Sequence, residues 1–145
     1  MACILVATDG SDGADRAVDY AAHLAKNEGG DLLIVHVIGG SGLPDNVFRQ
    51  FTHAEQAWLQ EQLELVSKKI LNAARDRARG IGAGTILLES RTGDVAQKIV
   101  EIAQEKNVEA IVIGKRGIGR IAGLLLGSIS QKVVSLAPRP VTVVP

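Results

Sequence analysis

Apolar residues along this chain fall into two alternating patterns. Short apolar runs rich in Val, Ile and Leu predict buried strands, and they cover residues 3–7, 32–38, 85–89, 110–113 and 140–144. Between these runs, apolar residues recur at steps of three and four, which predicts amphipathic helices over residues 14–26, 45–79, 93–106 and 128–136. The second of these helices is far longer than the ~11–12 residues of an ordinary helix, so we expect a break near its start.

Strands and helices alternate from one end of the chain to the other. This order predicts a parallel sheet with helices on both faces, here a single Rossmann-like α/β domain over residues 1–145 with an open five-stranded sheet. The composition agrees, because 46% of the residues are hydrophobic but only 3% are aromatic. An aliphatic core of this kind suits parallel strands that are buried on both faces.

Three polar or glycine-containing segments follow predicted strands directly. They are Thr8-Asp9, Ile38-Gly39 and Gly114. In doubly wound α/β folds, ligands bind beyond the carboxyl ends of the strands, where the strand order reverses. If the first and fourth strands are neighbours, these three segments converge on one crevice.

A glycine-rich segment links the fourth strand to the last helix. Gly114 and Gly117 are followed, nine residues later, by Gly127, Ser128 and, two residues on, Ser130. Glycines allow backbone N–H groups to approach an anion, and a helix N-terminus adds unpaired N–H groups and partial positive charge. We interpret the segment as a triphosphate cradle. The alternative is a flexible loop whose following helix is capped by Ser128.

Four charged residues near these segments have two interpretations each. Asp9 can accept hydrogen bonds from ribose hydroxyls or reach a metal, or it can form an Asx turn at the start of a helix. Lys115, Arg116 and Arg120 can offset the charge of a triphosphate, or they are ordinary solvated loop residues.

No catalytic constellation stands out. The three histidines, His23, His36 and His53, lack the spacing of metal ligands, and we expect His36 to be packed or hydrogen-bonded within its strand. No Gly-x-Ser-x-Gly nucleophile motif occurs. The chain is therefore not an obvious enzyme, and at most weak ATP hydrolysis is expected.

Charge and hydropathy exclude several partners and locations. The 16 basic and 16 acidic residues give zero net charge, so we expect no nucleic-acid or membrane partner. No apolar stretch approaches the ~18 residues of a membrane helix and no signal pattern precedes the first strand, which favours a cytoplasmic location. Cys3 is the single cysteine; we expect a small buried hydrophobe rather than a reactive thiol.

Taken together, the motifs resemble those of the universal stress protein family. The resemblance covers residues 4–11, residues 35–37, the Gly-x2-Gly-x9-Gly-Ser spacing from Gly114 to Ser128, and the ending over residues 138–144. The glycine motif resembles that of the ATP-binding branch of the family.

This resemblance implies a fold and a ligand. The sheet would have strand order 3-2-1-4-5, and the cofactor would be ATP, with Mg²⁺ or Mn²⁺ as candidate cations on the phosphates. Asp9 would contact the ribose and Val37 would bracket adenine through its backbone. The phosphates would be held by residues of the glycine segment, namely Gly114, Gly117, Gly127, Ser128 and Ser130.

The resemblance also implies a homodimer that pairs the last strands edge to edge. The sequence supports this independently, because an apolar edge strand invites pairing, and the last strand carries Val141, Thr142, Val143 and Val144.

Three functions remain open at this point. The first is an ATP-binding stress sensor or regulator. The second is a slow ATPase or a phosphate- or adenylate-transfer enzyme assisted by Asp9 and a metal. The third is a dimeric interaction protein with a vestigial nucleotide site.

Overall fold

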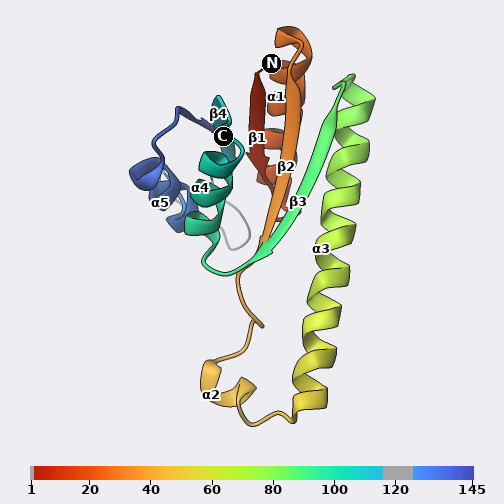
Figure 1. Ribbon diagram of the computed structural model, residues 1–145, viewed down its shortest axis with the longest axis vertical. Coiled ribbons are helices and arrows are strands. Elements are labelled where there is room, and N and C mark those ends of the chain that lie inside the picture. The colour runs from red at the N-terminus through yellow and green to blue at the C-terminus, as the bar shows by residue number, and fades with distance from the viewer. Residues whose placement is uncertain (1, 116–125) are drawn as a thin grey trace.

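The computed structural model describes residues 2–115 and 126–145, and strands alternate with helices along them (Figure 1). The strands are β1 (Cys3–Ala7), β2 (Asp31–Ile38), β3 (Ile86–Thr92), β4 (Ala110–Gly114) and β5 (Val141–Val144). The helices are α1 (Asp12–Glu28), α2 (Asp45–Phe48), α3 (His53–Ile81), α4 (Val95–Glu105) and α5 (Ser128–Leu136).

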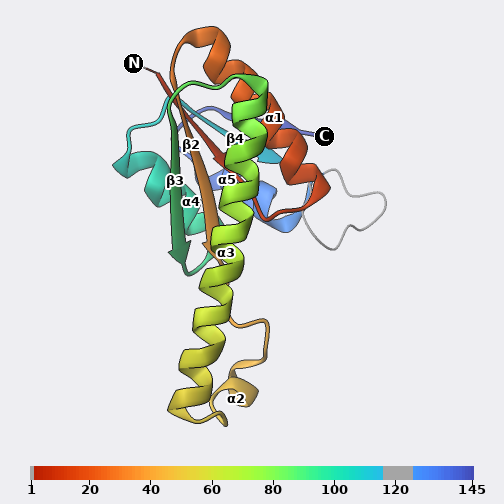
Figure 2. The ribbon, with the colours of Figure 1, turned by 90° about the vertical axis from the view of Figure 1, so that its right-hand side faces the viewer.

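The five strands form one parallel sheet in the order β3-β2-β1-β4-β5. Helices α1 and α3 lie on one face, and α4 and α5 lie on the other (Figure 2). Alternation along β1 shows the two cores: Ile4 and Val6 pack with residues of α1 and α3, whereas Leu5 packs with residues of α4. The predicted α/β fold and strand order are confirmed. Among the described residues, no helix is long and apolar enough to cross a membrane.

The predicted break in the long helical segment is also confirmed. α2 is a single turn, and α3 begins separately at His53, after a capping box formed by Thr52 and Glu55. The Glu55 N–H donates to Thr52 Oγ1 at 3.1 Å, and the Thr52 N–H donates to Glu55 Oε1 at 2.9 Å. These two bonds satisfy backbone N–H groups at the new helix start, which otherwise lack partners.

Only the C-terminal half of α3 packs against the sheet. Its buried residues are Ser67, Leu71, Ala74 and Ala78. The half before Ser67 projects, together with α2, past the carboxyl ends of β2 and β3 (Figures 1 and 2). α3 therefore forms an arm at the edge of the sheet where ligands of this fold class bind.

Strand β3 is longer than predicted. It ends at Thr92 rather than at residue 89, and it stays paired with β2 up to the register pair Ile38–Thr92. β3 is an edge strand, so polar residues such as Ser90 and Arg91 extend the ladder without burying unpaired groups. Arg91 also pairs with Glu105 of α4, which supports its place in the strand.

Cys3 is half-buried rather than fully buried. Burial first, and the carboxylate of Asp31 second, raise the pKa of its thiol above the ordinary value. Because the thiolate is the reactive form, a raised pKa lowers reactivity. The interpretation of Cys3 as an unreactive residue is therefore supported, although its burial is only partial.

Two glycines at the end of α3 predict opposite effects of the same substitution. Gly80 is helical, and a Cβ there would meet nothing within 4 Å, whereas Gly82 ends the helix at φ +107°. Gly80→Ala is expected to raise the free energy of unfolding by about 0.5–1 kcal/mol, and Gly82→Ala to lower it by about 1 kcal/mol. Urea denaturation of both variants checks this; shifts of the same sign would contradict the observed helix end.

Candidate functional site

The turn between β1 and α1 is held by three side chains. Asp9 Oδ1 accepts the Ser11 N–H at 2.9 Å, Thr8 Oγ1 accepts the Gly10 N–H at 3.1 Å, and Ser11 Oγ caps α1 by accepting the Ala14 N–H at 3.2 Å. The Asx turn considered from the sequence is thus present. It is compatible with a ligand role, because a carboxylate has about four acceptor sites on its two oxygens. The turn fixes Asp9 at the carboxyl end of β1.

A backbone contact joins this turn to the end of β4. A Cβ added to Gly114 would lie 3.0 Å from the Gly13 carbonyl oxygen and 3.1 Å from the carbonyl carbon of Gly13. Contacts this short to backbone mean that a side chain at position 114 would force the start of α1 to shift. Gly114 therefore allows the β1–α1 turn and the β4–α5 connection to lie side by side.

The base of the β4–α5 connection is closed by hydrogen bonds around Lys115. The Lys115 N–H donates to Val144 O at 2.7 Å, and the Gly127 N–H donates to Lys115 O at 2.9 Å. Ser130 Oγ lies 2.8 Å from Lys115 O and 3.0 Å from Gly127 O. The two ends of the connection are therefore held together, and Gly127 is placed at the start of α5. Gly117, Arg116 and Arg120 lie outside the described residues.

The two predicted serines differ in their surroundings. Ser130 is buried and its hydroxyl is 2.8 Å from an acceptor within the connection, whereas Ser128 is exposed at the first position of α5. The first backbone bond within α5 runs from the Gln131 N–H to Gly127 O. The N–H groups of Ser128, Ile129 and Ser130 precede this bond, so they point out of the helix N-terminus.

The backbone polar groups of Val37 point toward the end of β1. The Val35 carbonyl accepts the Thr8 N–H at 2.9 Å, so the backbone polar groups of Val35 point toward β1. Because this direction alternates along a strand, the groups of Val37 also point toward β1. β1 ends its pairing with β2 at Ala7–Val35, so the groups of Val37 lie beyond it, beside the Asp9 turn.

A polar network that the sequence did not reveal links β2, α3 and β3. His36 Nδ1 lies 2.6 Å from Ser67 Oγ, which lies 2.7 Å from Ser90 Oγ. Ser67 is 1% exposed, so these bonds satisfy a hydroxyl that would otherwise be costly to bury. Burial lowers the pKa of His36 below its ordinary value, and the charge of Asp9 opposes this shift. The expectation that His36 is packed or hydrogen-bonded is confirmed. The sequence signal for its partner is a serine on the buried side of an otherwise aliphatic helix face.

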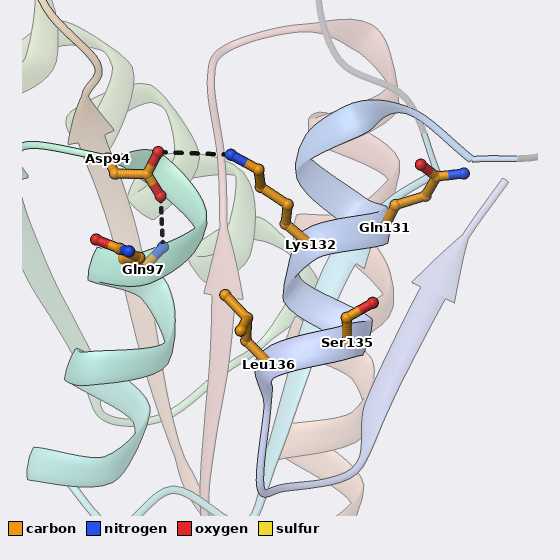
Figure 3. A pocket seen from close by; sticks show the side chains of 6 residues that line it. All are labelled: Asp94, Gln97, Gln131, Lys132, Ser135 and Leu136. Atoms are coloured by element: carbon orange, nitrogen blue, oxygen red, sulfur yellow. Dashed lines mark hydrogen bonds and ion pairs between the residues drawn. The ribbon is translucent and has the colours of Figure 1, made fainter.

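A separate depression lies between α4 and α5 (Figure 3). Its volume is about 380 Å³, and Asp94, the cap of α4, lies at its rim 3.8 Å from Lys132 Nζ. None of the residues around it is a predicted nucleotide ligand; they are Asp94, Gln97, Gln131, Lys132, Ser135 and Leu136. In the described part of the chain, no group of three or more His, Cys, Asp and Glu residues is placed to hold a metal ion.

Comparison with known proteins gives the family. The model of the universal stress protein family matches residues 2–145. The chain belongs to this family. Universal stress protein YxiE of Bacillus subtilis is 36% identical over an alignment of 146 residues, which covers 97% of each chain. A universal stress protein of Thermus aquaticus is 38% identical over 141 residues, which cover 97% of this chain and 96% of the relative.

Solved structures of the family share this fold. The protein is similar to UspA of Lactobacillus plantarum, with a TM-score of 0.82 at 26% identity over 99% of this chain and 97% of the other. A universal stress protein in complex with cAMP gives 0.74 at 29% identity over 99% and 95%. The universal stress protein of Archaeoglobus fulgidus in complex with dAMP gives 0.68 at 26% identity over 100% and 98%.

The lowered pKa of His36 makes stability depend on pH. The unfolded chain takes up a proton near pH 6.5, whereas folded His36 does so only at lower pH. Stability is therefore expected to fall as the pH drops below 6.5 toward the folded pKa. Urea denaturation between pH 5 and 8 measures this slope. His36→Gln should flatten it, while substitution of the exposed His53 with Gln should not; equal slopes in all three proteins would contradict the burial of neutral His36.

Proposed function

We propose that this protein is an ATP-binding member of the universal stress protein family that acts in the cytoplasm as a nucleotide-dependent sensor or regulator. The observation that carries the proposal is the contact between Gly114 and Gly13. This contact supports the proposal, because Gly13 lies in the first turn of α1, directly after the Asp9 turn, and Gly114 lies where the connection to α5 begins. The two solved relatives with bound cAMP and dAMP support an adenine nucleotide as the ligand.

The groups at this edge fit the parts of a nucleotide. The N-terminal N–H groups of α5, the exposed Ser128 hydroxyl and the cation of Lys115 suit phosphate oxygens. Gly117, which lies outside the described residues, stays a predicted phosphate ligand. Asp9 suits the ribose hydroxyls. The backbone N–H and C=O of Val37 suit adenine. They lie beyond the end of β1, so β1 does not occupy them with strand hydrogen bonds.

Gly127 and Ser130 have a supporting part in this proposal. The Gly127 N–H and the Ser130 hydroxyl contact Lys115 O, and these contacts hold the two ends of the β4–α5 connection together. Whether Ser130 also reaches a phosphate stays a prediction. Mg²⁺ or Mn²⁺ would be carried mainly by the phosphates, which are strong oxygen ligands for hard cations.

The phosphate site is tested by adding a negative charge where the phosphates would lie. Ser128→Asp favours the helix, because a carboxylate at a helix N-terminus interacts well with the dipole, but it should repel ATP. Isothermal titration is expected to show at least about a tenfold rise in the Kd for ATP, or ~1.4 kcal/mol, with little change for adenosine.

The matched control is Ser135→Asp, an exposed position near the other end of α5, which should leave the Kd for ATP within about twofold, or ~0.4 kcal/mol. Equal effects of both substitutions would contradict the placement of the phosphates. Release of phosphate from ATP, followed in the same samples, distinguishes a slow ATPase from a protein that only binds. Absence of ATP binding at millimolar concentration would leave the interaction protein with a vestigial site.

We also propose that the protein is a homodimer through β5. The carbonyls of Pro140 and Val144 accept bonds from the β4 side, so the backbone groups of Thr142 point to β4 as well, and those of Val141 and Val143 point away from the sheet. These outward groups, between half-buried apolar side chains, can pair with a second copy.

The strand pairing predicts a selective effect of proline. Val143→Pro removes an outward N–H but no bond to β4, so it should convert a dimer to a monomer in sedimentation experiments. Val143→Ala is the control for loss of the side chain and should remain a dimer. A Val143→Pro variant that still dimerises with an unchanged dissociation constant would exclude pairing at this edge.

A further inference from the structure

The outer face of α3 carries two large apolar residues that the fold leaves uncovered. Trp58 is 61% exposed and Leu65 is 51% exposed. They are seven residues apart and so share one face of the helix. At about 100° per residue, this face lies roughly opposite the buried face that begins at Ser67. Packing against the sheet therefore does not account for them.

Charged residues are sorted by sign on either side of Leu65. Glu61 and Glu64 precede it, and Lys68 and Lys69 follow it. Within residues 2–115 and 126–145, none of the four has an ion-pair partner within 4.0 Å. The arm thus presents an acidic segment, an apolar centre and a basic segment in that order.

We propose that a second copy of this chain packs on this face, with the two α3 helices antiparallel and a twofold axis near Leu65. This symmetry places Leu65 against its own counterpart. It also sets Glu61 of each helix opposite Lys69 of the other, because these residues lie four positions before and four positions after Leu65. A parallel arrangement would instead place like charges together, which is destabilising.

The self-complementary charge pattern is the reason for choosing a second copy over another protein. An interface with twofold symmetry joins a patch to itself, so each partner must carry both signs at matched distances from the axis. Glu61 lies four residues before Leu65 and Lys69 lies four residues after it, so this pair satisfies the condition. Glu64 and Lys68, one residue before and three residues after, add charge of the same sign on each side.

The position of α3 makes the face accessible and separate from the β5 edge. α3 packs on the sheet near β2 and β3, at the opposite end of the strand order from β5. In both ribbon views, no other helix covers the side of α3 that faces away from the sheet (Figures 1 and 2). Pairing through α3 can therefore occur with or without pairing through β5.

Trp58 is the only tryptophan in the chain, so its fluorescence reports on this face alone. The emission of Trp58 in the full-length protein is measured at protein concentrations of about 1–500 µM and compared with sedimentation velocity. A Kd in this range corresponds to an association free energy near −5 to −8 kcal/mol. Burial should shift the emission to shorter wavelength as concentration rises. Added salt should weaken the shift, because exposed charge pairs are screened.

Two charge variants test the geometry. Glu61→Lys with Glu64→Lys makes the face basic throughout, and Lys68→Glu with Lys69→Glu makes it acidic throughout. Each variant alone should lose the concentration-dependent shift, and an equimolar mixture of the two should recover it, because every antiparallel contact then joins opposite charges.

Circular dichroism of both variants verifies that the helix is retained. A Trp58 spectrum that does not depend on concentration would overturn the proposal. So would variants that self-associate like the original protein, or a mixture that shows no recovery. A dimer seen by sedimentation without any change at Trp58 would belong to another surface, and it would also count against pairing through α3.

Discussion

The approach of two backbones at the carboxyl edge of the sheet is the constraint on which the site depends. Gly114 ends β4, and a Cβ at position 114 would lie only 3.0 Å from the carbonyl oxygen of Gly13. Because parallel strands with right-handed crossovers bring β1 and β4 together at the centre of the sheet, their following turns compete for the same space. Glycine resolves this competition, and the Asp9 turn and the α5 connection become neighbours.

A second feature ties this edge to the arm. Ser67 is the first buried residue of α3 and contacts His36 of β2, while the charge of Asp9 acts on the pKa of His36. The point where α3 leaves the sheet is therefore close, through one histidine, to the carboxylate that we assign to the ribose.

Much of the fold could be predicted from the pattern of apolar residues. Runs of β-branched residues and helical spacing depend on local sequence, and so does the break before His53. The end of β3 was predicted too early, because polar residues at an edge strand resemble the start of a loop. The strand order came from the family resemblance, since local patterns do not determine which strands pair.

The site was predictable in part. Gly114 and Ser128 signalled an anion site and Asp9 signalled a ribose or metal ligand, and the structure brings their segments together. The direction of the Val37 backbone depends on the register of β2 against β1, which no single segment encodes. The contact between His36 and Ser67 joins residues 31 positions apart, so spacing could not reveal it.

The most direct test of the nucleotide site is to denature the purified protein and identify the small molecules that it releases by chromatography and mass spectrometry. The account predicts an adenine nucleotide in near-stoichiometric amount, with ATP itself as the main species. Release of no adenine nucleotide, from a protein that also fails to bind added ATP at millimolar concentration, would contradict it.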